Sequence, residues 1–513
     1  MKVNKIVIVG GGSSGWMTAA ALCKSFPDLD ITLIESKDIK TIGVGESTVA
    51  EFNSYLDLLE LEDKDWMKDC DATYKVSIAF TDFREKNTKF QYPFGLSAAP
   101  QISLGHDCWP AIRQLDPEAC PLEKFAEFYN ANTYLADENK IIDNIDQSIP
   151  NFKFKYDTAY HFDSTKFGLY LRDNICKPAG VKHLLEEVSG VEKKENGDVK
   201  YIITESGQKL DADLFIDCSG FKSILLEKEM GGVFNSFNDT LLNDRALATK
   251  LDYDDKNVEM ENVTNCTAIE NGWVWNIPLW SRIGSGYVYS SKFADRDQAE
   301  REFRSHLESK GKQIPEDAEI LDIHIKHGVM DRAWIGNVLG IGLSYGFVEP
   351  LESTGLLTTH ENIYRLVRML ERRNRVVNSI DRTALNVYLS GLLGGVKSFL
   401  EMHYGLSMRD DTEYWRYVTD IDYGQTTDVD QILDNVIATS NFNGMKGGLI
   451  YIAAGMGYLP TYRFGDGYGY INNDDAEALR NVYREYDIFS YSTREYIKTL
   501  PSHYEYLRDN IYV

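Results

Sequence analysis

The sequence predicts an α/β protein whose first part is a doubly wound, dinucleotide-binding fold, and three early features predict it. The apolar run Lys5–Val9 is typical of a buried parallel strand. A glycine-rich turn follows, and residues 16–26 then have a helical pattern that Pro27 ends. A second strand pattern, Asp30–Glu35, completes one strand-helix-strand unit within about 35 residues.

The later elements are predicted from apolar periodicity and from the positions of glycine and proline. In order, they are a glycine-bearing turn at 41–47 with Gly43 and Gly45, a helix over 48–61, a strand over 72–83, loops and short helices over 84–155, a helix over 164–176, strands and turns over 180–290, and a helix with an apolar stripe at Ile363, Leu366, Val367 and Leu370. Residues 396–513 have a mainly helical pattern. We therefore expect a nucleotide-binding module with an interleaved sheet over 1–395 and a helical region over 396–513.

Composition and charge exclude several classes of function. The chain has 513 residues, 43% of them hydrophobic, and a net charge of −25, which argues against nucleic-acid or anionic-membrane partners. The seven cysteines are odd in number, scattered and without a CxxC pair, which indicates a reduced, cytoplasmic protein without structural zinc. We also expect no signal peptide, no membrane span and no metal site.

The glycine-rich turn has the spacing of a nucleotide-binding loop. Gly10, Gly12 and Gly15 form GxGxxG, with Ser13 and Ser14 between the last two glycines. Such glycines allow a tight turn, close approach to a pyrophosphate and close helix packing. Glu35, at the end of the second predicted strand, is placed to accept a hydrogen bond from a ribose hydroxyl. This motif alone does not distinguish FAD from NAD.

A later segment favours FAD. Leu214–Asp217 followed by Cys218, Ser219 and Gly220 looks like the second nucleotide-contacting strand and turn of FAD-dependent monooxygenases, which marks Asp217 and Gly220 as candidate cofactor contacts. An ordinary core strand that ends in a turn is the alternative. Gly342 lies in the segment where hydroxylases of that group commonly carry Gly-Asp, but residues 340–344 contain no aspartate.

Two further motifs make the assignment more specific. Residues 346–355 read GFVEPLESTG, a glycine-bearing loop that runs into a helical pattern, and such a junction suits an anion. Trp273, Trp275, Ile277 and Pro278 form the pattern WxWxIP. Together with the glycine loop, and in this order, these motifs resemble those of the flavin-dependent halogenases, in particular those that act on indoles and related aromatics.

The resemblance covers about residues 1–395 and implies a fold and a chemistry. The fold is an FAD-binding, monooxygenase-like doubly wound fold with an added β-sheet, and residues 396–513 bind the substrate. A separate flavin reductase supplies FADH2, which with O2 and halide, chloride or bromide, gives hypohalous acid. This oxidant passes through a tunnel to a lysine beside a small aromatic substrate. We also expect a homo-oligomer.

The same resemblance assigns roles to individual residues. Lys75, inside an apolar strand, matches the lysine that hydrogen-bonds hypohalous acid or forms a haloamine. Glu352 matches the carboxylate that faces it, and Ser353 supports the pair. Thr354 and Gly355 match residues whose backbone amides hold halide. The WxWxIP segment is the wall that separates the organic substrate from flavin.

Simpler interpretations of these residues stay open. Lys75 could extend to water from a sheet edge, and Glu352 could only complement a helix dipole. The tryptophans could be core residues. His106 and His161 fit structural roles, and His324 and His327 alone make no metal site.

Two other functions compete with the halogenase. An aromatic hydroxylase on the same fold would consume NAD(P)H itself and would not need Lys75. A non-catalytic flavin-binding sensor or scaffold would need neither Lys75 nor Glu352.

Overall fold

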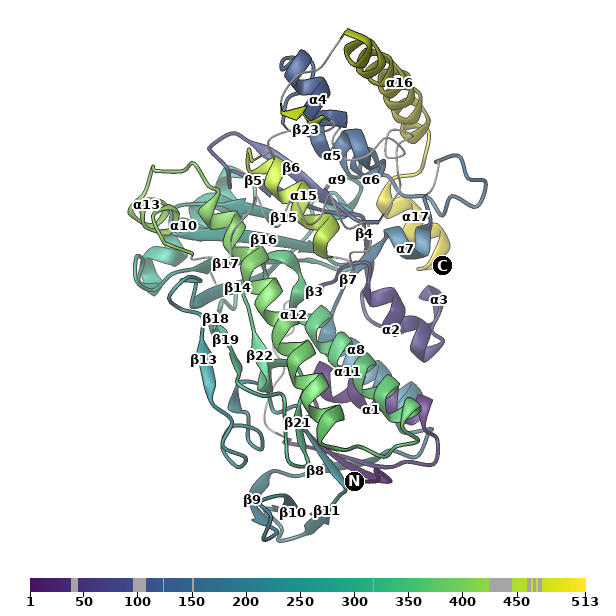
Figure 1. The fold of residues 1–513 in the computed structure, drawn as a ribbon, viewed down its shortest axis with the longest axis vertical. Helices are drawn as coiled ribbons and strands as arrows, with labels where there is room; N and C mark the ends of the chain where they lie inside the picture. Colours follow the sequence, from purple (N-terminus) through teal and green to yellow (C-terminus); the bar gives the residue numbers. More distant parts are fainter. Residues whose placement is uncertain are drawn as a thin grey trace.

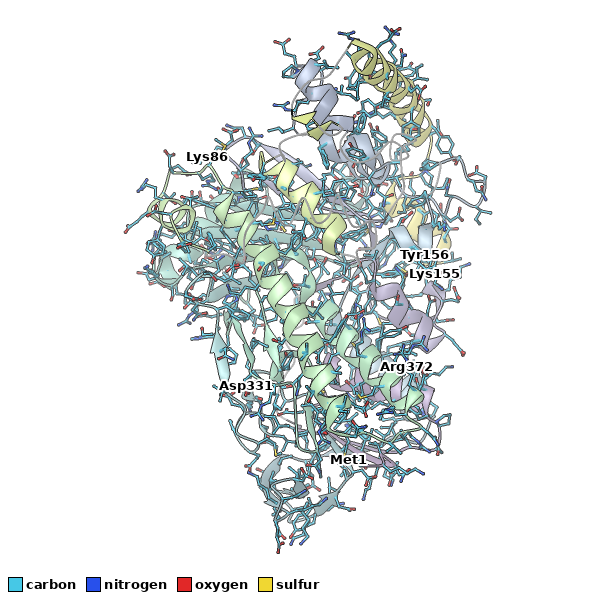
Figure 2. All side chains as sticks on the ribbon, in the orientation of Figure 1. Met1, Lys86, Lys155, Tyr156, Asp331 and Arg372 are labelled. Carbon is cyan, nitrogen blue, oxygen red and sulfur yellow. The ribbon has the colours of Figure 1, made fainter. Side chains whose placement is uncertain are left out.

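The computed structural model describes residues 1–37, 45–95, 108–122, 124–149, 152–316, 318–423, 445–458, 463–464, 467–468 and 473–513. Two large sheets and a layer of long helices organise it (Figure 1). Charged side chains such as Lys86, Lys155 and Asp331 project from the periphery (Figure 2). The predicted turn at 41–47 lies partly outside the described residues, since only its residues from Gly45 onward are included.

A six-stranded sheet forms the predicted doubly wound part. Its order is β20-β21-β12-β1-β2-β8, with β1 parallel to both β2 and β12. The bounds are β1 Lys5–Val9, β2 Asp30–Glu35, β8 Lys182–Leu185, β12 Leu214–Asp217, β20 Trp334–Ile335 and β21 Val338–Gly340. The two strands predicted at the start of the chain are therefore neighbours in the middle of this sheet, as a doubly wound fold requires.

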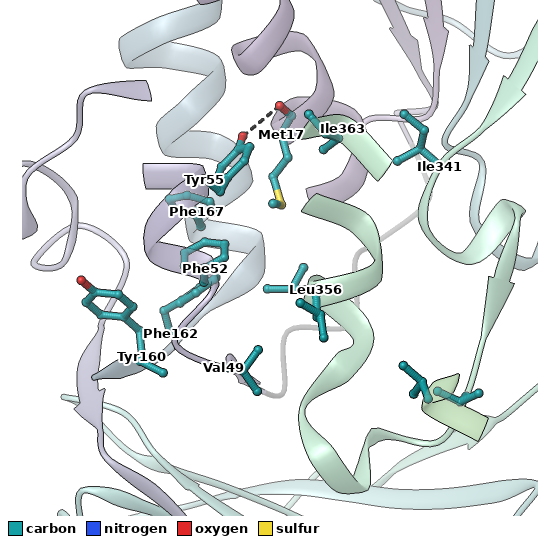
Figure 3. Packing of buried hydrophobic residues seen from close by; sticks show 14 of the residues in the cluster. Met17, Val49, Phe52, Tyr55, Tyr160, Phe162, Phe167, Ile341, Leu356 and Ile363 are labelled. Carbon is teal, nitrogen blue, oxygen red and sulfur yellow. Dashed lines mark hydrogen bonds between the residues drawn. The ribbon is translucent and has the colours of Figure 1, made fainter. Parts of the chain in front are cut away.

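Helices pack around the glycine-rich turn that follows β1. Helix α1, Ser13–Ser25, packs against α8, Ser164–Tyr170, and against α11, Thr354–Arg372. The helix predicted over 164–176 is present, but its second half, η2 Leu171–Cys176, is a π-helix. Buried aromatic rings of Phe52, Phe162 and Phe167 fill the space beside α1, and Tyr55 donates a hydrogen bond of 2.8 Å to the carbonyl of Met17 (Figure 3).

A seven-stranded sheet carries the aromatic WxWxIP segment. Its order is β18-β14-β17-β16-β15-β5-β6. The bounds are β5 Ser77–Thr81, β6 Lys89–Pro93, β14 Arg245–Leu251, β15 Val263–Ala268, β16 Gly272–Pro278, β17 Ile283–Tyr289 and β18 Leu321–His324. This is the added sheet that the sequence predicted.

Two predictions in this part of the chain need correction. The strand expected over 72–83 is split at Val76, because β4, Thr73–Lys75, pairs with β7 while β5 pairs with β15. Strand β6 lies in a stretch where only loops and short helices were expected. Its five residues alternate too briefly for a sequence pattern to reveal, and pairing with β5 stabilises it.

A three-stranded sheet, β3-β7-β4, lies near the centre of the molecule, between the six-stranded and the seven-stranded sheet (Figure 1). Strand β3 is Glu46–Ser47 and β7 is Ala159–Phe162. Ser47 and Thr73 both pair directly with His161, one from each side. Residues opposite each other in antiparallel strands share one face, so these three side chains form a row.

Helices dominate the C-terminal region, as predicted. The bounds are α12 Ser379–Gly405, α13 Glu413–Thr419, α15 Met445–Gly455, α16 Asn473–Lys498 and α17 His503–Asn510, with a small hairpin of β23 Arg463–Phe464 and β24 Gly467–Tyr468. The expected boundary at residue 395 falls inside α12, which continues across it. The division into two regions therefore stays a prediction. None of the described helices is long and apolar enough to span a membrane.

The remaining elements are short or lie on the outside. They are α2 Phe52–Leu59, α3 Asp63–Trp66, α4 Cys108–Leu115, α5 Lys124–Tyr129, α6 Asn132–Asp137, α7 Phe154–Asp157, β9 Val188–Lys193, β10 Val199–Thr204, β11 Lys209–Asp211, η3 Gly220–Lys222, β13 Phe234–Ser236, α9 Lys256–Glu259, α10 Arg296–Ser309, β19 Gly328–Met330, η4 Gly342–Ser344, β22 Gly346–Phe347 and η5 Pro350–Glu352. Helix α2 is shorter than the predicted 48–61. It begins at Phe52, after residues 48–51, which are not helical, and it ends at Leu59.

Gly286 on β17 provides a test of the packing around Trp275. A Cβ built there overlaps the indole ring of Trp275 and the carbonyl of Leu247. We expect Gly286→Ala to lower the free energy of unfolding by about 1–3 kcal/mol, the usual effect of overpacking. Gly391→Ala is the control, because Gly391 is exposed in α12 and its Cβ would meet nothing within 4 Å. That change should raise stability by about 0.4–1 kcal/mol in urea unfolding. Equal effects of the two substitutions would contradict this account of Trp275.

Candidate active site

The glycine loop lies tightly against two strand ends. Gly10 has φ +114°, and a Cβ built on it overlaps the carbonyl of Cys218 at the end of β12. A Cβ on Gly11 overlaps the Glu35 carboxylate, and one on Gly15 overlaps the carbonyl of Gly10. Glycine is therefore required at these positions for the loop to pass between β2 and β12.

The helix that follows this loop presents free backbone donors. Gly12 is the N-cap of α1 and supplies no side-chain hydrogen bond, so the first N–H groups of the helix are open to an anion. Gly342, with φ +71°, lies against Ser14, because a Cβ built on it overlaps the Ser14 side chain. Ser13 donates to the carbonyl of Ser164 at 3.2 Å. The loop, the helix start and the Gly342 turn thus fit the pyrophosphate of a dinucleotide.

The other predicted cofactor residues, Glu35, Asp217 and Gly220, have different surroundings. Glu35 ends β2, and its Oε1 lies 2.7 Å from Nε2 of His183. Asp217 is fully buried, and its carboxylate accepts hydrogen bonds from Ser219 and from the backbone N–H groups of Leu225 and Leu226. The Asp217 side chain therefore holds the turn after β12. Gly220, with φ +66° and nothing within 4 Å of a built Cβ, leaves open space beside that turn.

Lys75 ends strand β4 and is fully buried, so it does not extend to water from a sheet edge. Its Nζ donates hydrogen bonds to Ser47 Oγ at 2.8 Å, to the Thr48 carbonyl at 3.0 Å and to Ser353 Oγ at 2.9 Å. The ring centroid of Phe94 lies 4.9 Å from Nζ. Burial lowers the pKa of Lys75 to about 7, although Cys266 and Glu352 raise it.

Glu352 lies in the same buried region but contacts a histidine. It ends the 3₁₀ turn η5, and His403 Nε2 from α12 lies 2.7 Å from its Oε1. This contact is not aligned as a hydrogen bond, and among the described residues neither oxygen of Glu352 has a hydrogen-bond donor. Burial raises the pKa of Glu352, against His403 and Lys75, which lower it. The carboxylate is thus coupled to Lys75 through charge and not through a direct bond.

His403 is a site residue that sequence reasoning missed. It is fully buried, and its Nδ1 faces the carbonyl of Phe399 at 3.1 Å. Nothing in the local pattern of α12 distinguishes it from a core histidine. Only the packing of α12 brings it to Glu352, which is 51 positions earlier in the chain.

The start of α11 provides further polar groups. Ser353 is its N-cap, with φ +57° and ψ +31°, a left-handed conformation that costs about 1 kcal/mol or more for a residue other than glycine. This conformation directs its hydroxyl to Lys75 and to Ser47 Oγ, 3.0 Å away. Thr354 and Gly355 are the first residues of α11, where no side chain caps the backbone N–H groups. These donors suit an anion.

The WxWxIP residues occupy strand β16. Trp273, Trp275 and Ile277 are all buried, and the two indole rings have centroids 6.1 Å apart. A Cβ built on Gly45 would lie 3.4 Å from Ile277, so the turn before β3 passes over this strand, next to Pro278. The tryptophans belong to the main core, and their role as a wall stays a prediction.

The histidines noted in the sequence take different places. His161 is buried and hydrogen-bonded, and His106 lies outside the described residues. His324 is on β18, and His327 Nε2 contacts the carbonyl of Asn243. Across the described ranges, no three His, Cys, Asp or Glu residues are grouped as metal ligands.

A model of the tryptophan halogenase family matches residues 5–462. The chain belongs to this family of flavin-dependent halogenases. Over 434 residues it is 35% identical to the tryptophan 7-halogenase RebH of Lentzea aerocolonigenes. This match covers 81% of this chain and 78% of RebH. The resemblance inferred from the three motifs is thereby confirmed.

Solved structures agree over nearly the whole chain. The apo structure of VirX1 has a TM-score of 0.89 and 44% identity, and the match covers 100% of this chain and 99% of VirX1. The tryptophan 6-halogenase SttH of Streptomyces toxytricini has a TM-score of 0.84 and 30% identity, with 98% and 99% covered. The predicted fold is confirmed, and the family favours a flavin-dependent halogenase over the hydroxylase and over a non-catalytic scaffold.

The lowered pKa of Lys75 has a consequence for stability. Between about pH 7 and 10, this lysine binds a proton in the unfolded chain but not in the folded protein, so the free energy of unfolding contains a contribution that rises with pH. We expect this contribution to approach about 1.4 kcal/mol per pH unit and to vanish in Lys75→Met. Urea unfolding of both proteins at pH 7.5 and 9.5 (about two units apart) measures it. Identical slopes would show that Lys75 titrates as in water.

Proposed function

We propose that this protein halogenates a small, electron-rich aromatic molecule of the indole type, using FADH2 from a separate reductase, O2 and halide. The observation that carries the proposal is the fully buried Lys75, with its pKa lowered to about 7, close to the equally buried Glu352. Strongly perturbed ionisable groups gathered in one buried region are typical of reaction sites.

The residues around α1 would hold the cofactor. The Gly10–Gly15 loop and the open N–H groups of α1 would bind the pyrophosphate, and Glu35 would accept from the ribose. Reduced FAD, when bound, would donate electrons to O2, and halide would donate the remaining electrons as it is oxidised to hypohalous acid, with the second oxygen atom leaving as water. The N–H groups of Thr354 and Gly355 would hold halide, because halides accept hydrogen bonds without strong directional demand.

Lys75 can either activate hypohalous acid by a hydrogen bond or react with it. As an ammonium it would exchange one of its three present hydrogen bonds for a bond to the oxygen, which makes the halogen more electrophilic. As an amine it attacks the halogen and forms a haloamine, with the oxygen leaving as water. A pKa of about 7 keeps both forms accessible near neutral pH.

Glu352 is placed to handle the proton that substitution releases. When the aromatic ring takes the halogen, it becomes cationic and must lose a proton to regain aromaticity. A carboxylate whose oxygens have no aligned donor among the described residues, and whose pKa burial raises, is a suitable acceptor for it. His403, whose Nε2 lies 2.7 Å from Oε1, would position this carboxylate.

The surroundings support an aromatic substrate. The ring of Phe94 lies 4.9 Å from Lys75 Nζ, and Tyr92 is close enough to Glu352 for the two groups to interact through charge. RebH and SttH, both similar to this chain, are halogenases of tryptophan, an indole. We extend the indole class, and not tryptophan itself, to this protein.

The function is tested by reconstitution. The protein with FAD, a flavin reductase, NADH, a halide and a panel of indoles and phenols should give monohalogenated products detectable by mass. Omission of the reductase should abolish product, because this chain is proposed not to oxidise NADH. NADH oxidation by the chain alone, coupled to hydroxylated product, would support the hydroxylase instead.

Substitution of Lys75 and Glu352 separates oxidant formation from halogen transfer. We expect Lys75→Ala to abolish aromatic product while reduced flavin is still reoxidised at the wild-type rate in stopped-flow absorbance. Glu352→Gln should slow product formation by roughly 10²-fold or more, the usual effect of a positioned acid or base. Gly391→Ala is the control for handling and flavin loading. Wild-type product formation by Lys75→Ala would remove Lys75 from the mechanism.

A further inference from the structure

Lys75 stands at one end of a continuous row of buried hydrogen-bonding groups. Its Nζ contacts Ser47 Oγ at 2.8 Å, and Ser47 Oγ lies 2.7 Å from Thr264 Oγ1. Thr264 Oγ1 in turn lies 2.8 Å from His161 Nε2. All four side chains are buried, and His161 and Lys75 have no exposed surface. The row therefore connects the amine to an imidazole without passing through solvent.

The sheet topology produces this row. Ser47 of β3 and Thr73 of β4 flank His161 of β7 in register, and Lys75 is two residues past Thr73 on the same face of β4. Thr264 comes from β15 of the seven-stranded sheet. The row thus lies where the three-stranded sheet meets the seven-stranded sheet. Its members come from four separate strands, β3, β4, β7 and β15.

The donors in this row all point away from Lys75. Thr73 donates its one hydroxyl hydrogen to the carbonyl of Pro278 at 2.6 Å, so it can only accept from His161 Nδ1, 3.4 Å away. Neutral His161 therefore carries its hydrogen on Nδ1 and accepts at Nε2. Thr264 must then donate to Nε2 and accept from Ser47.

Ser47 completes the polarity of the row. Its hydroxyl donates to Thr264, and its oxygen accepts from Lys75 and from Ser353, whose Oγ lies 3.0 Å away. Each group thus donates toward His161 and accepts from the Lys75 side. Such an alignment lets a proton shift along the row by one hydrogen-bond exchange per group.

We infer that Ser47, Thr264 and His161 form a proton wire that takes a proton from the Lys75 ammonium, so that Lys75 can react as an amine. This inference rests on the proposed function, in which Lys75 accepts the halogen. The ammonium proton passes to Ser47, Ser47 passes its own to Thr264, and Thr264 passes its own to His161 Nε2. The products are a neutral amine and an imidazolium.

The cycle closes without a further reactant. The amine takes halogen from hypohalous acid, forming a nitrogen–halogen bond, and the oxygen leaves as water with one amine hydrogen. Transfer of the halogen to the ring releases one ring proton, which returns to the nitrogen through Glu352. His161 then gives its proton back along the wire and restores the ammonium.

The charges around the wire favour a single shared proton. Burial lowers the pKa of His161 well below its ordinary value, and the charge of Lys75 lowers it further. His503 also faces His161 and acts in the same direction, while Cys266 and Glu352 face Lys75. The proton thus rests on Lys75. Its release removes the repulsion by Lys75, while burial, the larger cause, still lowers the pKa of His161.

The test is a pair of substitutions at Thr264, whose hydroxyl bonds to Ser47 and to His161. Thr264→Val keeps the shape of the side chain but removes the hydroxyl, whereas Thr264→Ser keeps the hydroxyl. Thr249→Val is the matched control, because Thr249 is a buried threonine of β14 in the same sheet, with a hydroxyl that donates to the backbone carbonyl of Glu319 at 3.0 Å.

Single-turnover halogenation is followed from pH 6 to 9 with pre-reduced FAD, O2 and bromide, with an indole as substrate. We expect Thr264→Val to lose at least tenfold in rate at pH 6, where Lys75 is an ammonium, and to approach wild type at pH 9, where it is already an amine. Thr264→Ser and Thr249→Val should follow the wild-type profile, and reoxidation of flavin should be unchanged in all variants.

Two results would overturn the wire. One is a Thr264→Val variant with the wild-type rate at pH 6, and the other is a loss that is equal at every pH, which a purely structural hydroxyl would produce. If the wild type itself gave no halogenated product at any pH, the proposed function and the wire would fail together.

Discussion

The burial of one ammonium group, that of Lys75, is the constraint on which the centre of this protein depends. Removing a charged lysine from water costs several kcal/mol unless its hydrogens find acceptors. Here each of the three N–H bonds has one: Ser47, the carbonyl of Thr48 and Ser353. The acceptors come from the adjacent residues Ser47 and Thr48 and from Ser353 at the start of α11. Two segments that are distant in sequence must therefore converge on β4 before the lysine can be buried.

The segment from Gly346 to Gly355 connects this centre to the nucleotide-binding half. It supplies Glu352 and Ser353 to the buried region and then becomes α11, which packs against α1. The first turns of these two helices carry the open N–H groups assigned here to halide and to pyrophosphate. A displacement of α11 would therefore disturb both sites.

Much of this could be predicted from sequence because the signals were local. The GxGxxG spacing, the GFVEPLESTG junction and WxWxIP each lie within ten residues, and they placed the first sheet, the helix start and β16 correctly. The partners of the reacting groups could not be predicted in this way. His403, Thr264 and Ser47 are ordinary residues in their own segments, and only strand register and helix packing bring them to Glu352 and Lys75. The split of the predicted strand at Val76 has the same origin, since pairing with different sheets decides it.

Two buried carboxyl groups three residues apart, those of Glu349 and Glu352, differ in their hydrogen-bond partners. Glu349 accepts from Asn243 at 3.0 Å and from Tyr404, and burial raises its pKa to about 7 in spite of these bonds. These bonds occupy the Glu349 carboxylate, so this residue, at the start of η5, ties the segment after β22 to Asn243 and to α12. Glu352 is equally buried, but the described part of the chain gives its oxygens no aligned donor, only the nearby His403.

A buried acceptor without donors is unfavourable in a resting protein. It becomes favourable when a proton arrives, and an aromatic ring that has just gained a halogen delivers one. The contrast supports the proposal that Glu352 transfers a proton, whereas the hydrogen bonds of Glu349 support the fold.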